Sequence, residues 1–247
     1  MARNNFRAKT SEQKEIYDCF GCLADRYGRW QVWADFITLS ACSLDVLDQT
    51  QRKRREEEYM SIAKRYSSDE MNKFAEMFAI VINALDRNQA QDFLGELFMS
   101  MDLGNEWKGQ FFTPYSVCAA MARLNNARED QQYKLWDTVC DPACGAGATL
   151  IAYANECRRK NINYQTSVLF VAQDVDRVAA LMCYIQLSLL GCPGYIVIAD
   201  SLSNPVVGPL LFPGKREGQE IWYTPMFFSE IWTVRKKFEI IQSLITK

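Results

Sequence analysis

The stretch Val139-Cys140-Asp141-Pro142-Ala143-Cys144-Gly145-Ala146-Gly147 decides the fold of this chain. Residues 135–140 are apolar and partly β-branched, a pattern typical of a buried strand. Residues 148–160 carry apolar side chains at helical spacing and end in basic residues, which indicates a helix. A strand, a glycine turn and a helix in this order form the ligand-binding corner of a doubly wound α/β sheet, where glycines let a ligand approach the backbone.

Two further predicted strands end in carboxylates. Residues 168–172 lead into Gln173-Asp174-Val175, and residues 195–199 lead into Asp200-Ser201-Leu202. A carboxylate at the tip of the second strand suits the two hydroxyls of a ribose, and Asp200 can accept a hydrogen bond from an adenine amino group. Val175 can pack on the adenine ring. Carboxylates at such tips also serve as helix caps, but two of them after a glycine corner favour a nucleotide ligand.

A capped helix is predicted upstream of the glycine turn. The segment Gly109-Gln110-Phe111-Phe112-Thr113-Pro114 precedes an apolar helical pattern over residues 115–124. Pro114 fits the first turn of that helix, and Thr113 can cap it. The free N–H groups and the positive dipole at such a helix start can hold a carboxylate.

Together these motifs resemble the S-adenosylmethionine (SAM) half of the N6-adenine DNA methyltransferases, in particular the modification subunits of type I restriction systems. The resemblance covers residues 92–227 and implies that the F-x-T-P segment holds the methionine part of SAM. A nicotinamide dehydrogenase is disfavoured, because Leu150 replaces the third glycine of the dinucleotide fingerprint. The residues predicted to bind the cofactor are Phe112, Thr113, Pro114, Asp141, Ala143, Gly145, Gly147, Asp174, Val175, Asp200, Ser201 and Leu202.

The catalytic motif of this family, Asn or Asp followed by two prolines and an aromatic residue, is degenerate here. The resemblance implies that the motif follows the fourth strand, where its Asn accepts hydrogen bonds from the target amino group and its aromatic ring stacks on a flipped base. Residues 220–223 are predicted to be that strand. The predicted catalytic residues are therefore Thr224, Pro225 and Phe227. Asn204-Pro205-Val206-Val207 competes for this role, but it lies too close to Asp200 for an intervening strand and crossover.

The chain is predicted to have two domains. Apolar residues recur at helical spacing from residue 14 to residue 101, so residues 1–105 form a predicted helical domain. Residues 106–247 form the predicted SAM-binding domain, with a Rossmann-like sheet truncated after its fourth strand. The resemblance implies a seven-stranded sheet, so we expect the exposed edge at the fourth strand to be covered by the final helix, a homodimer or a partner chain.

Composition indicates a reduced, cytoplasmic protein. The nine cysteines are odd in number, and neither a signal peptide nor a membrane span is evident. The absence of histidine excludes Ser-His-Asp and Cys-His catalysis. Cys19-Phe20-Gly21-Cys22 lacks a second pair at zinc spacing, so no metal site is expected. The formal charge of −2 leaves any DNA contact to local basic clusters, which are residues 52–55, 158–160 and 235–237.

Two functions from different classes stay open. The first is a SAM-dependent N6-adenine DNA methyltransferase, a short form typical of phages or mobile elements, which needs a partner chain for activity. The second is a SAM-binding pseudoenzyme that acts as an interaction or regulatory subunit on DNA or on a restriction complex. Thr224 and the short region after it favour the second function. A methyltransferase acting on RNA or on protein amides is a third, weaker hypothesis.

Overall fold

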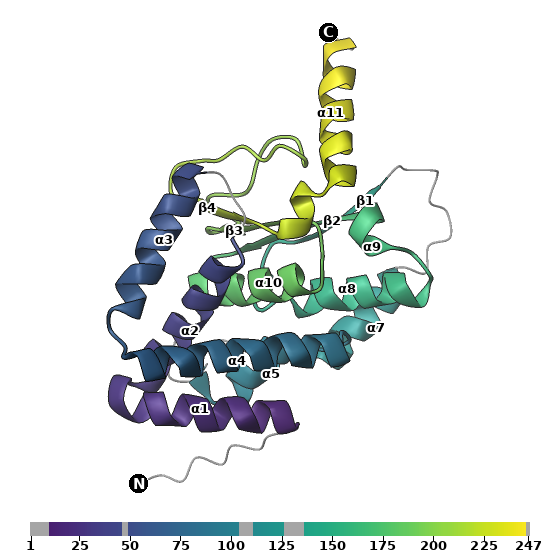
Figure 1. Cartoon of the computed structure of the whole chain (residues 1–247). Coiled ribbons are helices and arrows are strands. Elements are labelled where there is room, and N and C mark those ends of the chain that lie inside the picture. The colour runs from purple at the N-terminus through teal and green to yellow at the C-terminus, as the bar shows by residue number, and fades with distance from the viewer. Residues whose placement is uncertain (1–9, 46–48, 104–110, 126–135, 246–247) are drawn as a thin grey trace.

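The computed structural model describes most of the chain, namely residues 10–45, 49–103, 111–125 and 136–245. A four-stranded sheet lies above several layers of helices (Figure 1). In spatial order its strands are β1 (Asp137–Asp141), β2 (Val168–Asp174), β3 (Gly194–Ile198) and β4 (Glu220–Tyr223). The first three strands are parallel, whereas β4 is antiparallel to β3. The predicted α/β class with a Rossmann-like sheet is confirmed, and the described residues contribute four strands to that sheet.

The connections between the parallel strands place two helices on one face of the sheet. α8 (Ala148–Arg159) and the short α9 (Tyr164–Ser167) connect β1 to β2, and α10 (Arg177–Leu189) connects β2 to β3. β2 and β3 are buried along nearly their whole length, because each has a strand on both sides and packed side chains on both faces. β1 is only half-buried, and no strand of the described chain pairs with its outer edge.

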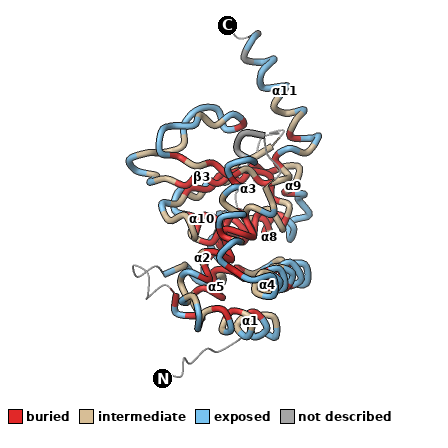
Figure 2. The backbone as a smooth tube through the Cα atoms, turned by 60° about the vertical axis from the view of Figure 1, so that its left-hand side comes forward, coloured by how far each residue is buried: buried red, intermediate tan, exposed pale blue. Residues whose placement is uncertain are grey.

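The predicted helical region packs beneath α10 (Figures 1 and 2). Its helices are α1 (Ser11–Tyr27), α2 (Arg29–Ser43), α3 (Gln49–Ala63), α4 (Ser68–Arg87) and α5 (Phe93–Ser100). Ser67 and Glu70 form a reciprocal capping box at the start of α4, as its sequence indicates. α2 runs against α10, and the buried side chains of both belong to one continuous core.

The division into two domains stays a prediction. The expected boundary between residues 1–105 and 106–247 falls on residues outside the described part of the chain, as do Gly109 and Gln110. Within the described ranges, no helix is both long and apolar enough to cross a lipid bilayer.

β4 does not end at the edge of the sheet where the resemblance places the end of the catalytic strand. Such a strand must end where the parallel strands end, because ligands of α/β sheets bind at the carboxyl ends of the strands. β4 is antiparallel, with Tyr223 opposite Tyr195, so the chain leaves β4 at the amino end of β3. The physical reason is the connection over residues 199–219, which contains no helix. A return loop of this kind joins antiparallel strands, whereas parallel pairing needs a crossover, usually through a helix.

The final helix, α11 (Glu230–Ile245), projects away from the sheet (Figure 1). Its first turns are anchored, because Trp232 is fully buried and its indole N–H donates to the Gln165 carbonyl at 2.8 Å. Farther along, the side chains of Val234, Phe238 and Ile241 are more than half exposed. α11 therefore does not cover the β4 edge, which contacts α3 instead.

Candidate cofactor site

The glycine turn between β1 and α8 depends on two left-handed residues. Gly145 and Gly147 have φ angles of 51° and 96°, which residues with side chains rarely adopt. A Cβ on Gly147 would lie 2.8 Å from the sulfur of Cys183, and a Cβ on Gly145 would lie 2.9 Å from the ring of Phe112. The turn is therefore packed between α10 and Phe112, and the structure brings the F-x-T-P segment against the glycine turn.

Asp141, the last residue of β1, closes the same turn. Its Oδ1 accepts a hydrogen bond from the backbone N–H of Ala143 at 3.0 Å, and its Oδ2 accepts one from the hydroxyl of Thr149. These two bonds tie the strand end to the turn and to the first turn of α8. Asp141 and Ala143 thus lie in the predicted site, where they shape its backbone.

Asp174, at the end of β2, connects the second strand to the glycine turn. Its Oδ2 accepts from the backbone N–H of Gly145 at 2.8 Å, and its Oδ1 accepts from that of Asp176 at 2.9 Å. Burial raises the pKa of this carboxyl group, and the two backbone hydrogen bonds offset part of the rise. Each carboxylate oxygen has a second lone pair, so the group can accept further hydrogen bonds from a ligand.

The end of β3 presents a second carboxylate beside an apolar side chain. Asp200 accepts from the backbone N–H of Leu202 at 2.8 Å, a bond that lowers the pKa of Asp200. The side chain of Leu202 is 93% exposed and that of Val175, after β2, is 71% exposed. Ser201 lies half-buried between Asp200 and Leu202. Two exposed apolar side chains therefore lie beside two carboxylates at neighbouring strand ends.

Thr113 and Pro114 lie at the start of α7 (Tyr115–Asn125), next to the turn. The Pro114 carbonyl accepts the first backbone hydrogen bonds of this helix. An open hollow of about 580 Å³ separates the helix start from α5, and Phe112, Thr113 and Pro114 line it together with Asp92 and Glu96.

Gln186 of α10 supports the glycine turn from below and was missed by sequence reasoning. Its Nε2 donates to the Ala146 carbonyl at 2.8 Å and to Asp92 Oδ1 at 2.7 Å, and its Oε1 accepts from the backbone N–H of Leu94. Burial raises the pKa of Asp92 to about 6, although the hydrogen bond from Gln186 acts against the rise. The signal in the sequence was a glutamine inside the apolar helix over residues 179–190.

The predicted catalytic residues do not join this site. The side chain of Thr224 is fully buried, donates to the Cys192 carbonyl at 2.7 Å and accepts from the backbone N–H of Gly194 at 3.0 Å. These partners lie immediately before and at the first residue of β3, whereas Asp174 and Asp200 lie at the opposite ends of their strands. The structure therefore does not bring Thr224 together with Asp174 and Asp200, and its catalytic role stays a prediction.

Pro225 and Phe227 share this location. Pro225 begins the 3-10 helix η1 (Pro225–Phe228), and the ring of Phe227 is buried against Tyr195 and Tyr223. The side-chain amine of Lys236 lies 3.3 Å from the centre of the Phe227 ring. A ring enclosed in this way packs the upper face of the sheet and is closed to a flipped base.

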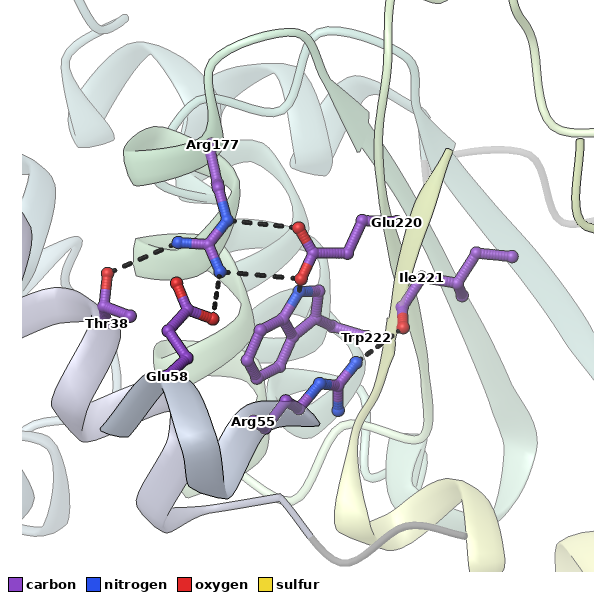
Figure 3. Close-up of polar contacts among 7 residues, drawn as sticks. All are labelled: Thr38, Arg55, Glu58, Arg177, Glu220, Ile221 and Trp222. Carbon is purple, nitrogen blue, oxygen red and sulfur yellow. Dashed lines mark hydrogen bonds and ion pairs between the residues drawn. The ribbon is translucent and has the colours of Figure 1, made fainter. Parts of the chain in front are cut away.

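A polar cluster anchors the acidic turn after β2 to the helical region (Figure 3). Arg177, the first residue of α10, pairs with Glu220 of β4 at 3.1 Å and with Glu58 of α3 at 2.9 Å. Burial lowers the pKa of Arg177, but the two carboxylates outweigh it and the pKa is raised. The segment that holds Asp174 is therefore fixed from both the sheet and the helices.

Arg55 forms the second part of this cluster. Its buried guanidinium lies 3.5 Å from the centre of the Trp222 ring, donates to the Ile221 carbonyl at 2.8 Å and pairs with Asp45 at 2.6 Å. The guanidinium of Arg55 is thus used inside the protein, so within the basic cluster 52–55 this side chain is not available for a contact with DNA.

Comparison with known proteins assigns the family. The sequence profile described as N-6 DNA Methylase matches residues 90–239, which include the glycine turn and both carboxylate strand ends. One similar solved structure, described as a class I S-adenosylmethionine-dependent methyltransferase from Listeria monocytogenes, shares 17% sequence identity with a TM-score of 0.42. The match covers 81% of this chain and 57% of that one, so the chain spans little more than half its length. No curated protein matches. The chain belongs to the N-6 DNA methylase family.

Proposed function

We propose that this protein binds SAM at the carboxyl ends of β1, β2 and β3 and takes part in N6-adenine methylation of DNA. The observation that carries the proposal is the geometry of Asp174. Backbone N–H groups of Gly145 and Asp176 fix its carboxylate beside the glycine turn, and free lone pairs remain for the two hydroxyls of a ribose. When bound, SAM would supply the methyl group, and the residues of the chain would hold SAM in position.

Other parts of SAM have matching groups around Asp174. The exposed side chains of Val175 and Leu202 offer apolar contact to a purine ring, and Asp200 can accept from the adenine amino group of SAM. The start of α7 next to Phe112 offers backbone N–H groups and a positive dipole end to the methionine carboxylate. The proposed site therefore combines three strand ends with one helix start.

An active enzyme needs a hydrogen-bond acceptor for the amino group of the target base, whereas a pseudoenzyme does not. Asn204 lies beyond Asp200 at the correct end of the sheet, and its Nδ2 donates to the Glu217 carbonyl at 2.9 Å. That bond leaves the side-chain oxygen of Asn204 as the acceptor we assign to the target base. The placement of Thr224 at the other end favours the alternative, a SAM-binding subunit without catalytic activity that acts in a DNA or restriction complex.

We further propose that a partner chain completes the sheet at β1. The outer edge of β1 has no partner strand in the described chain, although β1 leads directly into the glycine turn. Trp136, before β1, contacts Trp232 with ring centres 5.8 Å apart, which places the base of α11 next to this edge. The exposed apolar side chains of α11 therefore extend the same surface, and a second copy or another subunit would cover both.

Methyl transfer from labelled SAM tests the function. The protein is incubated with duplex DNA, alone and with candidate partner chains, and the digested nucleosides are separated. We expect label in N6-methyl-2′-deoxyadenosine, incorporated slowly by the chain alone and faster with the partner, and lost in Asn204→Ala. SAM binding without label in DNA under any condition would favour the inactive subunit. Label in another base or only in RNA or protein would contradict the assigned substrate.

A further inference from the structure

The basic clusters of the sequence have different environments in the structure. Arg55 is buried against Trp222, and the side chains of Arg235 and Lys236 donate to backbone carbonyls of the chain itself. The cluster over residues 158–160 is different, because it lies at the end of α8 beside an open hollow of about 590 Å³. Arg158 and Arg159 of this cluster line the hollow, so their positive charge faces a space large enough for a ligand.

Three helices and one loop form the hollow. The end of α4, the loop over residues 88–90, α7 and the last turn of α8 meet there (Figure 1). Its guanidinium groups come from Arg87, Arg123, Arg158 and Arg159, and its carboxylates from Asp86 and Glu156. Positive charge thus exceeds negative charge among the lining side chains.

Two of these guanidinium groups are already neutralised. Arg159 holds both carboxylate oxygens of Glu156, at 2.7 and 2.8 Å, and Arg87 pairs with Glu12 at 2.6 Å. The hydrogen bonds from Arg159 lower the pKa of Glu156, and the charge of Arg123 across the hollow adds to this effect. Glu156 is therefore ionised and bound mainly to its neighbour on α8.

Among the described residues, no carboxylate pairs with either of the other two guanidinium groups. Arg158 donates to Gln89 Oε1 at 2.6 Å and to Asn155 Oδ1 at 3.4 Å, and both of these acceptors are neutral. Within the described ranges, no carboxylate forms an ion pair with Arg158 or with Arg123. Neutral partners orient Arg158 and leave its charge uncompensated.

Side-chain hydrogen bonds also fix the walls of the hollow. Asn155 Nδ2 donates to the Gln89 carbonyl at 2.7 Å and to the Tyr115 hydroxyl at 3.3 Å, so it links the loop and α7 to α8. A hollow with fixed walls needs little reorganisation when a ligand binds.

We propose that this hollow binds a backbone phosphate of nucleic acid through Arg158 and Arg123. Guanidinium groups present paired donors that match phosphate oxygens, and an uncompensated charge gains most from an anion. The 12 residues of α8 separate the hollow from the glycine turn, a length of about 18 Å. That distance equals roughly five nucleotide steps of a DNA strand. The inference rests on the proposed function and adds to it a place where the DNA backbone is held.

DNA binding by charge variants tests this proposal. Fluorescence anisotropy with a labelled 20-base-pair duplex, in the absence of SAM, gives the affinity of the full chain over a range of salt concentrations. Arg158→Gln and Arg123→Gln should each weaken binding about threefold or more and reduce the salt slope by about one. The matched control is Arg54→Gln, which removes the same charge from an exposed position on α3 and should change the affinity less than twofold. Arg158→Lys keeps the charge and should recover part of the affinity.

The remaining outcomes decide the source of the phosphate. Equal effects of Arg158→Gln and Arg54→Gln on DNA binding would overturn the proposal. If inorganic phosphate stabilises the wild-type protein against heat but not Arg158→Gln, while DNA binding is equal in both, the site serves a free phosphate and the nucleic-acid assignment is wrong. Calorimetry with SAM on the same proteins separates the two proposals, because Arg158 lies outside the candidate cofactor site. SAM binding should stay at the wild-type level in every variant.

Discussion

The two edges of the sheet are constructed in opposite ways. At the β4 edge, Arg177 pairs with Glu220, and the buried Arg55 stacks on Trp222, so the chain closes this edge with its own helices. At the β1 edge, the strand is half-buried, its outer side has no partner strand in the described chain, and it leads into the glycine turn. The polar groups at the closed edge form ion pairs and hydrogen bonds with residues of the chain itself. Those beside the open edge can still accept hydrogen bonds from a ligand. Substitutions at the closed edge should therefore change stability, and those at the strand ends should change binding.

The largest effect is expected from Arg55→Ala at the closed edge. The change removes the guanidinium that pairs with Asp45, whose side chain is 2% exposed, and it removes the stacking on Trp222. We expect a loss of roughly 3–5 kcal/mol in the free energy of unfolding, measured by urea denaturation. The neighbouring Arg54→Ala, at an exposed position, should cost less than about 0.5 kcal/mol. Similar losses in both variants would mean that the cluster does not hold the edge.

A smaller loss of stability is expected from Thr224→Val. The substitution keeps the volume of the side chain but leaves the Gly194 N–H and the Cys192 carbonyl without this partner. We expect the free energy of unfolding to fall by roughly 3 kcal/mol or less, with SAM affinity unchanged in the folded protein. A loss of SAM binding or of methyl transfer without a loss of stability would restore Thr224 to the active site.

An effect of opposite sign is expected from Asp92→Asn beneath the glycine turn. The folded-state pKa of Asp92 is raised to about 6, above the value near 4 of an unfolded chain. The folded protein then binds the proton more tightly, so this group lowers stability as the pH rises from about 4 to about 6. Asp92→Asn keeps an oxygen for Gln186 and removes this penalty, so the variant should gain roughly 2 kcal/mol relative to the wild type between pH 4 and pH 7. Denaturation at several pH values measures the difference, and parallel pH curves would contradict the account.

The sequence predicted the local elements around the glycine turn well, because their determinants are local. The strand at Asp137–Asp141 and the turn through Gly145 and Gly147 each depend on neighbouring residues. The three parallel strands follow from the helical crossovers between them.

The sequence misplaced what depends on distant pairing. Residues 220–223 were recognised as a strand, but four residues do not reveal whether that strand pairs parallel or antiparallel. The antiparallel direction of β4 depends on the helix-free connection before it and on contacts with Arg55 and Arg177, which lie far away in the chain. Gln186 escaped notice for the same reason, because its partners come from α5 and the glycine turn.

Calorimetry with SAM tests the central claim most directly. The wild-type protein should bind SAM with a dissociation constant in the micromolar range, which corresponds to a free energy of binding of about −7 to −8 kcal/mol. Asp174→Ala should weaken binding by roughly 1.5–3 kcal/mol, since it removes charge-assisted bonds to the ribose, whereas Asp25→Ala on the exposed face of α1 should bind as the wild type does. No heat with SAM or its demethylated product at high protein concentration, or equal affinities of the two variants, would contradict a cofactor site at these strand ends.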